Sequence, residues 1–235
     1  MKSNLKYVLF SIFIIIIGIG IISFINENWD NEHISSNTNI DTSNIDRGKI
    51  FLSKYSKSSN KIVTTIKDEE ITEKELALYE AYNDEENIIE KIVEDKIILK
   101  CAEDNNIVLD EEDNKRIKIY KEKLENNDIY ESEEFKNSGL SKEEFVNIML
   151  NFYKDIAIQS KYKSIVRQNL LKGNLYTDDE ELNKKIKNFN KKYVEWTEKW
   201  QKGKLTNKEI EKIYKLQEEM VEEYFKYIVE KEKSK

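Results

Sequence analysis

Several residue types that mark common protein classes are missing or scarce in this sequence. Its 235 residues include no proline, six glycines, one cysteine and one histidine. A single cysteine excludes a disulfide within the chain. The net charge of −7, with both signs mixed, does not favour a nucleic-acid-binding protein, because such proteins present a basic face. His33 lies in a polar stretch, where we expect a solvated side chain and no metal or catalytic role.

Motifs that carry catalytic chemistry are also missing. The sequence contains no HExxH, CxxC, P-loop, GxGxxG or GxSxG pattern. The acidic clusters Asp110–Asp113 and Asp178–Glu181 lie at predicted helix N-termini, where they complement the helix dipole, so we interpret them as caps and not as metal ligands. We expect Cys101 to be a small buried hydrophobe, since nothing marks a partner for its thiolate. The sequence therefore predicts no catalytic residue, no metal site and no cofactor.

The longest uncharged run lies near the N-terminus. Tyr7–Ile25 would form a helix about 28 Å long, close to the roughly 30 Å hydrocarbon core of a bilayer. Lysines precede it and acidic residues follow it. This charge pattern predicts a single-pass anchor in the cell membrane, with residues 1–6 in the cytoplasm and the C-terminal domain outside. A cleaved signal peptide is the alternative, but its apolar region would normally be shorter and would end in an A-x-A-like site.

Residues 26–60 are predicted to be a disordered linker. They are rich in Asn, Ser, Asp and Thr, with scattered apolar residues and no period, so they would bury too little apolar surface to offset chain entropy. From residue 61 to residue 235 the pattern is that of a folded domain with enough length to form a core.

This domain is predicted to be mainly α-helical. Ile62–Ile66 is β-branched throughout and is the one convincing strand. Asn87–Leu109 carries apolar residues around more than half of its circumference, which predicts a central core helix with neighbours on two or three sides. Recurring cap pairs are found at Thr72/Glu75, Asp110/Asp113, Ser141/Glu144, Thr177/Glu180 and Thr206/Glu209. They divide the domain into helices near 72–82, 85–105, 111–126, 141–171, 178–201 and 207–231, with a weaker one at 132–137.

The last two helices are predicted to form a hairpin over residues 178–235. In both, apolar and aromatic residues recur at alternating steps of three and four positions, and the polar segment Gln201–Lys204 joins them. Two such seams separated by a short turn are typical of an antiparallel helical pair.

The order of these segments resembles the N-terminal domain of SurA/PrsA-type chaperones, a helical domain of the trigger factor/SurA-like kind. In that family a short strand leads into an ITxxEL sequence, here Ile71–Leu76, and a GLSxEEF sequence opens a later helix, here Gly139–Phe145. The core helix Ile88–Ala102 matches the hydrophobic spacing that the family places between them. The resemblance covers about residues 62–166, and it rests on apolar spacing and caps.

The resemblance implies a chaperone that binds unfolded or secreted polypeptides, but not an enzyme. Many family members continue into a parvulin prolyl-isomerase domain, which is Gly-rich and contains His. After Leu175 this chain has one glycine and no histidine, so we expect no isomerase activity. Two alternatives remain open, a scaffold or adaptor that binds one envelope or membrane partner, and a prolyl isomerase.

Aromatic residues on the later helices are the candidate contacts for client polypeptides. Tyr and Trp combine an apolar body with a polar edge, and they suit surfaces that hold varied peptides, although they also build ordinary cores. The candidates are Phe152, Tyr153, Tyr162, Phe189, Tyr193, Trp196, Trp200 and Tyr224.

Overall fold

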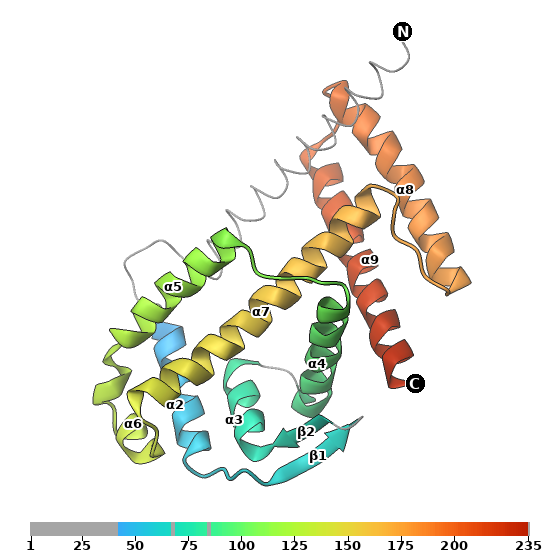
Figure 1. The fold of residues 1–235 in the computed structure, drawn as a ribbon. Helices are drawn as coiled ribbons and strands as arrows, with labels where there is room; N and C mark the ends of the chain where they lie inside the picture. The colour runs from blue at the N-terminus through green and yellow to red at the C-terminus, as the bar shows by residue number, and fades with distance from the viewer. Residues whose placement is uncertain (1–41, 67–68, 84–85, 235) are drawn as a thin grey trace. The chain divides into compact units, whose positions relative to one another are not determined.

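The computed structural model describes residues 42–66, 69–83 and 86–234 (Figure 1). Over these residues the protein is mainly α-helical, with eight α-helices and one two-stranded sheet, which confirms the predicted fold class. The chain divides into two units, Met1–Asp46 and Arg47–Lys235, and the second contains nearly all of the described residues. None of the described helices is long and apolar enough to cross a membrane, and the predicted anchor at 7–25 lies outside the described residues.

The elements follow one another with short connections. In chain order they are α2 (Thr42–Tyr55), β1 (Ile62–Ile66), β2 (Glu69–Thr72), α3 (Glu73–Tyr82), α4 (Ile88–Asp104), α5 (Glu111–Glu125), the 3₁₀ helix η1 (Asp128–Glu131), α6 (Glu133–Ser138), α7 (Lys142–Leu171), α8 (Glu180–Gln201) and α9 (Asn207–Lys233). These bounds lie within about three residues of the predicted ones from α3 onward.

Side-chain caps account for this agreement. Four of the predicted N-caps are confirmed, at Thr72, Asp110, Ser141 and Thr206. The predicted cap at Thr177 is wrong. The N-cap of α8 is Asp179, whose carboxylate accepts a hydrogen bond of 2.7 Å from the backbone N–H of Leu182. Both residues are good N-caps, and the chain turns into the helix two residues later than the spacing suggested.

The predicted strand is confirmed, and it pairs with a second strand. β1 and β2 run antiparallel, with Thr64 opposite Ile71 and Thr65 opposite Glu70. Ile71 is fully buried and belongs to a small cluster with Tyr79 of α3 and Ile92 of α4. The β1–β2 hairpin therefore packs against one end of the α3–α4 pair.

The longest helix, α7, connects two larger cores and runs diagonally through the fold in Figure 1. Its N-terminal half packs with α2, α3, α5 and η1 in the first core, which is formed by Phe51, Leu52, Ala81, Ile117, Leu124, Ile129, Phe145, Val146, Met149 and Leu150. Its C-terminal half packs with α4, α8 and α9 in the second core, which is formed by Ile98, Ala102, Tyr162, Val166, Leu170, Leu175, Leu182, Ile186, Phe189, Met220, Val221, Phe225 and Val229.

The predicted core helix, α4, has neighbours on three sides, as expected. It contacts α3, α7 and α9, and it buries Ile92, Ile98 and Ala102. It also buries Asp95, which the apolar pattern did not predict, and this carboxylate lies 3.0 Å from the Nζ atom of Lys91 one turn earlier. A buried carboxylate is tolerated there because a cation accompanies it.

The predicted disordered linker is wrong over its C-terminal part, where the chain forms α2. Phe51 and Leu52 are fully buried in the first core, and Tyr55 one turn later packs against it. Gly48 allows close packing, because a Cβ atom there would lie 2.6 Å from the side chain of Ile129. The apolar residues of α2 are few but correctly spaced for one helix face, and burying that face offsets the entropy cost of ordering the segment.

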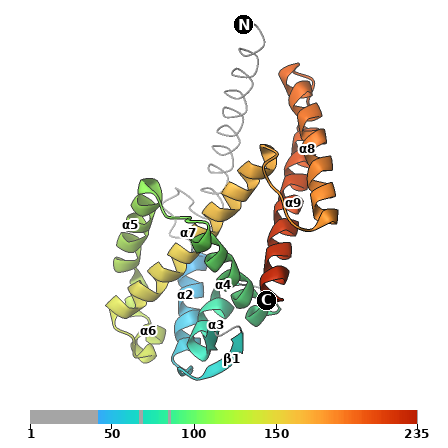
Figure 2. The same ribbon diagram turned by 45° about the vertical axis from the view of Figure 1, so that its right-hand side comes forward.

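The predicted C-terminal hairpin is present. Two ion pairs along its length, Lys185 with Glu223 and Lys199 with Glu209, show that α8 and α9 run antiparallel. Figure 2 shows the two helices side by side, with the turn between them lying beyond the end of α7. The hairpin therefore packs on α4 and α7 near its base and extends past them at its other end.

Candidate functional site

A pocket of about 530 Å³ lies where the C-terminal end of α4 meets α7, α9 and the loop between α7 and α8. Its most prominent lining residues are the four tyrosines Tyr162, Tyr176, Tyr224 and Tyr227. Its volume is within the range of small-ligand sites and of pockets that accept one or two side chains of a peptide.

The four tyrosines come from α7, α9 and the loop between α7 and α8. Tyr162 of α7 is only 6% exposed, and its ring meets that of Phe225 edge-to-face with the centroids 5.2 Å apart. Tyr224 and Tyr227 lie one turn apart on α9, so they share one face of that helix. Tyr176 lies in the α7–α8 loop and is 68% exposed. The pocket thus has an inner wall of buried and half-buried rings and one exposed aromatic ring at its mouth.

The inner hydroxyls are polar groups that stay protonated. Burial raises the pKa of Tyr162 and that of Tyr224 above the ordinary value of 10.0. At neutral pH these phenols therefore keep their protons and can donate hydrogen bonds. Asn105 donates from its side-chain nitrogen to the Tyr162 oxygen at 3.5 Å and to the carbonyl of Cys101 at 2.7 Å, which links this wall to the end of α4.

One side of the pocket is held by a polar contact that we name the Asp178 latch, formed by Asp178, Tyr227 and Lys231. The Lys231 amine donates to the Asp178 carboxylate at 2.5 Å, and the Tyr227 hydroxyl donates to the other carboxylate oxygen. The hydrogen bond from Lys231, and then that from Tyr227, hold the pKa of Asp178 below its ordinary value of 3.8. The latch ties the α7–α8 loop to α9.

The charges around the pocket favour a cationic or neutral ligand. Asp104, Asp178 and Glu232 contribute carboxylates, whereas Lys231 is the one basic residue among the lining side chains. Cys101 also lines the pocket and is half-buried. It packs against the second core, as predicted, but it is not fully buried.

The structure separates the eight predicted contact residues into several groups. Tyr162 and Tyr224 line the pocket. Phe189 is buried in the second core, and Tyr193 and Trp196 pack against it. These last three residues are held inside the hairpin and do not reach the pocket.

The other three predicted residues lie elsewhere. Phe152 contacts Tyr79 edge-to-face at 5.4 Å, and Tyr153 stacks on Tyr120 at 4.4 Å, both in the N-terminal half of the fold. Trp200 is 43% exposed at the far end of α8.

Sequence reasoning missed Tyr176, Tyr227 and the Asp178 latch. Tyr227 could have been found, because it follows Tyr224 by three positions and therefore shares its helix face. Asp178 was interpreted as part of a capping cluster, and its actual partner, Lys231, lies 53 positions later in the chain. Nothing in the local pattern signals a contact of that separation.

A second group of charged residues lies between α3, α4 and α7, but it forms internal ion pairs. Glu75 lies 3.2 Å from Lys96, and Asp95 lies 3.0 Å from Lys91. Burial raises the pKa of nearby Asp155. No group of three or more His, Cys, Asp or Glu side chains within the described ranges could hold a metal ion. We interpret this group as part of the packing between the helices.

No family model, curated protein or solved structure matches the chain. The resemblance to SurA/PrsA-type chaperones therefore stays a prediction from the sequence.

Proposed function

We propose that this chain is a membrane-anchored, extracytoplasmic chaperone-like protein that binds segments of unfolded or secreted polypeptides without isomerase catalysis. The observation that carries the proposal is the tyrosine-lined pocket, because four amphipathic rings around one open hollow can accept varied side chains without demanding one shape. The SurA-like order of strand, core helix and capped helices, and the uncharged run at 7–25 as the anchor, support it from the sequence.

The chemistry of the pocket suggests which segments bind best. Aromatic or aliphatic side chains would pack on the rings of Tyr162 and Tyr224, and a Lys or Arg beside them would meet Asp104 at the rim. Such a charge contact is partly screened by salt, so binding of basic segments should weaken as ionic strength rises. Secreted chains are bound before they fold, when segments of this kind are exposed.

The test is suppression of client aggregation by the full-length protein, comparing the wild type with two single variants. Tyr176→Ser removes the ring at the mouth of the pocket, and Val108→Ser removes an apolar side chain outside the pocket. The two residues are 68% and 71% exposed, so the variants are matched for exposure and neither disturbs a core. Losing one aromatic contact of about 1 kcal/mol should raise the half-maximal concentration about fivefold for Tyr176→Ser. Val108→Ser should behave as the wild type.

Three outcomes would contradict the proposal. If the wild type does not suppress aggregation of any of several unrelated clients, general chaperoning is excluded, and a stoichiometric complex with one envelope protein would favour the scaffold alternative. If Val108→Ser weakens suppression as much as Tyr176→Ser, the pocket is not the binding site. Acceleration of a proline-limited refolding reaction would overturn the exclusion of isomerase activity.

A further inference from the structure

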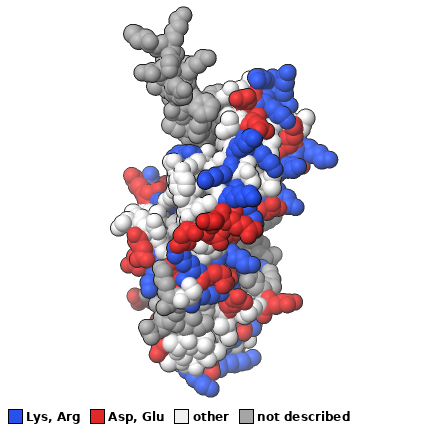
Figure 3. All heavy atoms as spheres, turned by 90° about the vertical axis from the view of Figure 1, so that its right-hand side faces the viewer, with Lys and Arg blue, Asp and Glu red and all other residues white. Residues whose placement is uncertain are grey.

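The turn of the C-terminal hairpin carries charge of one sign only. The segment Lys199–Lys208, which we name the hairpin tip, contains four lysines and no acidic residue in a chain whose net charge is −7. Figure 3 shows many Lys and Arg side chains, with some acidic ones among them, over the upper part of the hairpin, and a denser acidic band lower on the same face. The four lysines of the tip are flanked directly by Glu198 and Glu209, so the basic character is confined to the turn itself.

Most of this positive charge is available to a partner. Two acids flank the tip directly, Glu198 and Glu209. Glu209 is engaged by Thr206, whose backbone N–H and hydroxyl donate to it at 3.0 and 2.9 Å, and by Lys199 at 3.2 Å. The other three lysines, Lys202, Lys204 and Lys208, are exposed and form no ion pair with any residue that the structure describes. After that one pairing, three cations remain at the tip.

Exposed apolar groups accompany these cations. Trp200 is 43% exposed within the tip, and Val194 is 49% exposed less than two turns earlier on α8. Trp196 differs, because its ring packs inside the hairpin against Phe189 at 6.4 Å. A tryptophan beside lysines is the combination found where proteins meet the interface of a lipid bilayer, since the indole suits the headgroup region and the amines attract anionic lipids.

The position of the tip suits a flat partner. The turn lies beyond the end of α7 in both Figure 1 and Figure 2, so an extended surface can meet the tip without first meeting the acidic body. Charges more than about 8 Å from that surface are largely screened at physiological salt. A nucleic acid would instead need a basic stripe or face along which its backbone could lie, and the acidic remainder of the chain opposes this.

We propose that the hairpin tip docks on the anionic headgroups of a phospholipid membrane, with Trp200 entering the interface and Lys202, Lys204 and Lys208 contacting lipid phosphates. This goes beyond client binding, because it provides the folded domain with a second membrane contact at the opposite end of the chain from the proposed anchor. The tip and the tyrosine pocket share no residue, so the two proposals can fail separately.

The experiment places the full-length protein in vesicles whose lipids carry brominated chains, which quench tryptophan emission at short range. One set of vesicles is pure phosphatidylcholine, and the other contains a fraction of phosphatidylglycerol. The readout is the difference in quenching between the wild type and Trp200→Phe, which removes the contributions of Trp29 and Trp196. We expect this difference in the anionic vesicles and not in the neutral ones.

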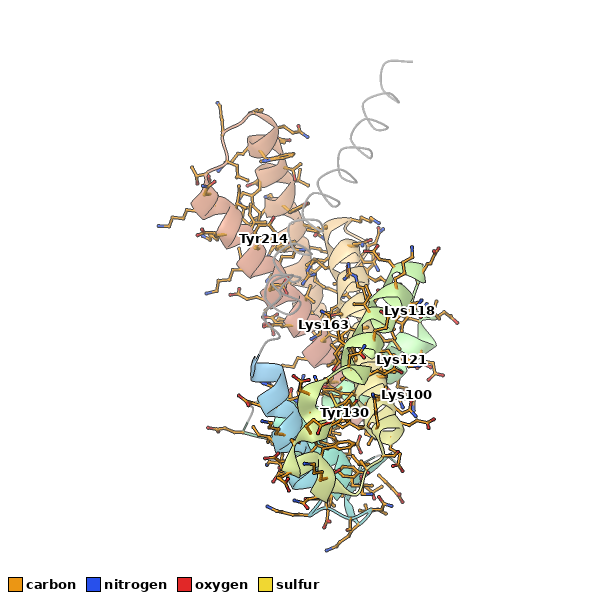
Figure 4. All side chains as sticks on the ribbon, turned by 90° about the vertical axis from the view of Figure 1, so that its left-hand side faces the viewer. Lys100, Lys118, Lys121, Tyr130, Lys163 and Tyr214 are labelled. Carbon is orange, nitrogen blue, oxygen red and sulfur yellow. The ribbon has the colours of Figure 1, made fainter. Side chains whose placement is uncertain are left out.

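Charge variants then test the lysines. Each lysine near an anionic surface contributes about fivefold in affinity, so Lys202→Glu with Lys204→Glu should weaken tip docking about 25-fold or more. The matched control, Lys100→Glu with Lys118→Glu, makes the same charge change at exposed positions on α4 and α5, away from the hairpin (Figure 4). It should keep the wild-type quenching. Raising the salt from about 0.1 M to about 1 M should also abolish the signal.

Three results would overturn the proposal. Equal quenching of Trp200 in neutral and anionic vesicles would exclude headgroup charge as the cause. An equal loss in the control pair would show a general effect of net charge. Absence of Trp200 quenching in both lipids, with normal circular dichroism of all variants, would exclude membrane docking and leave an acidic protein as the partner of the tip. Client suppression should be unchanged in the tip variants whichever result is found.

Discussion

The two halves of α7 show how one helix can support a closed core at one end and an open pocket at the other. At the N-terminal half, Phe145 packs with Phe51, Tyr130 and Phe135 at centroid distances of 6.0 to 6.2 Å. At the C-terminal half, Tyr162 packs edge-to-face on Phe225 and also lines the open pocket, together with tyrosines of α9 and of the α7–α8 loop. Phenylalanine has no polar group to satisfy, so it suits a sealed core. Tyrosine can leave its hydroxyl toward water or a ligand.

The two halves also differ in how neighbouring helices are held. At the N-terminal half, the Arg47 side chain donates to the backbone carbonyl of Tyr82 at 2.7 Å, next to a core that surrounds the helix. At the C-terminal half, exposed ion pairs link the helices, such as Lys185 of α8 with Glu223 of α9 at 3.1 Å. Exposed ion pairs contribute little stability. Each half is therefore stabilised mainly by its buried apolar side chains, ten in the first core and thirteen in the second.

The largest expected effect is in that first core. Phe51→Ala removes a fully buried ring and should lower the free energy of unfolding by about 3–5 kcal/mol. The neighbouring substitution Ile50→Ala, at a side chain that is 46% exposed, should change it by less than about 0.5 kcal/mol. Urea unfolding followed by circular dichroism measures both. Equal small effects would show that α2 does not contribute to the folded core and that the linker interpretation was right.

The second expected effect is smaller and of opposite sign. Gln217 is 1% exposed in the hairpin, and its side-chain nitrogen has no hydrogen-bond partner among the described residues. A buried unpaired polar group costs about 1–3 kcal/mol, so the similarly sized Gln217→Met should raise the free energy of unfolding by about 1 kcal/mol. Gln201→Met, at an exposed position on the same hairpin, is the control and should have little effect. A destabilised Gln217→Met protein would mean that the amide is satisfied in solution.

Most of the helical architecture could be predicted because its signals are local. An N-cap such as Ser141 and the apolar spacing after it act within one or two turns, and the hairpin seam is a repeat that needs no knowledge of its partner. α2 was missed because Phe51 and Leu52 are among only a few apolar residues that follow a long polar stretch. They stabilise a helix only by packing into a core that is formed by residues elsewhere in the chain.

The pocket could be predicted only in part. Tyr162 and Tyr224 were candidates because of their residue type, as were six aromatics that the structure places elsewhere. What makes a pocket is the meeting of the end of α4 with α9 and the α7–α8 loop. That meeting depends on tertiary packing, including the contact between Asp178 and Lys231, and no periodicity in the sequence encodes it.

The smallest expected effect concerns this latch. The carboxylate of Asp178 has a lowered pKa in the folded protein, so its contacts stabilise the fold at pH values above the ordinary 3.8, and the contribution is lost as the pH falls through the folded-state pKa. Asp178→Asn should therefore be slightly less stable than the wild type near neutral pH, and the two proteins should become equal in strong acid. Asp104→Asn, at an exposed position on the pocket rim, should match the wild type at both pH values. Urea midpoints at the two pH values measure the difference. A difference between wild type and Asp178→Asn that persists in acid would show that the side-chain shape, and not the charge of the latch, holds the α7–α8 loop against α9.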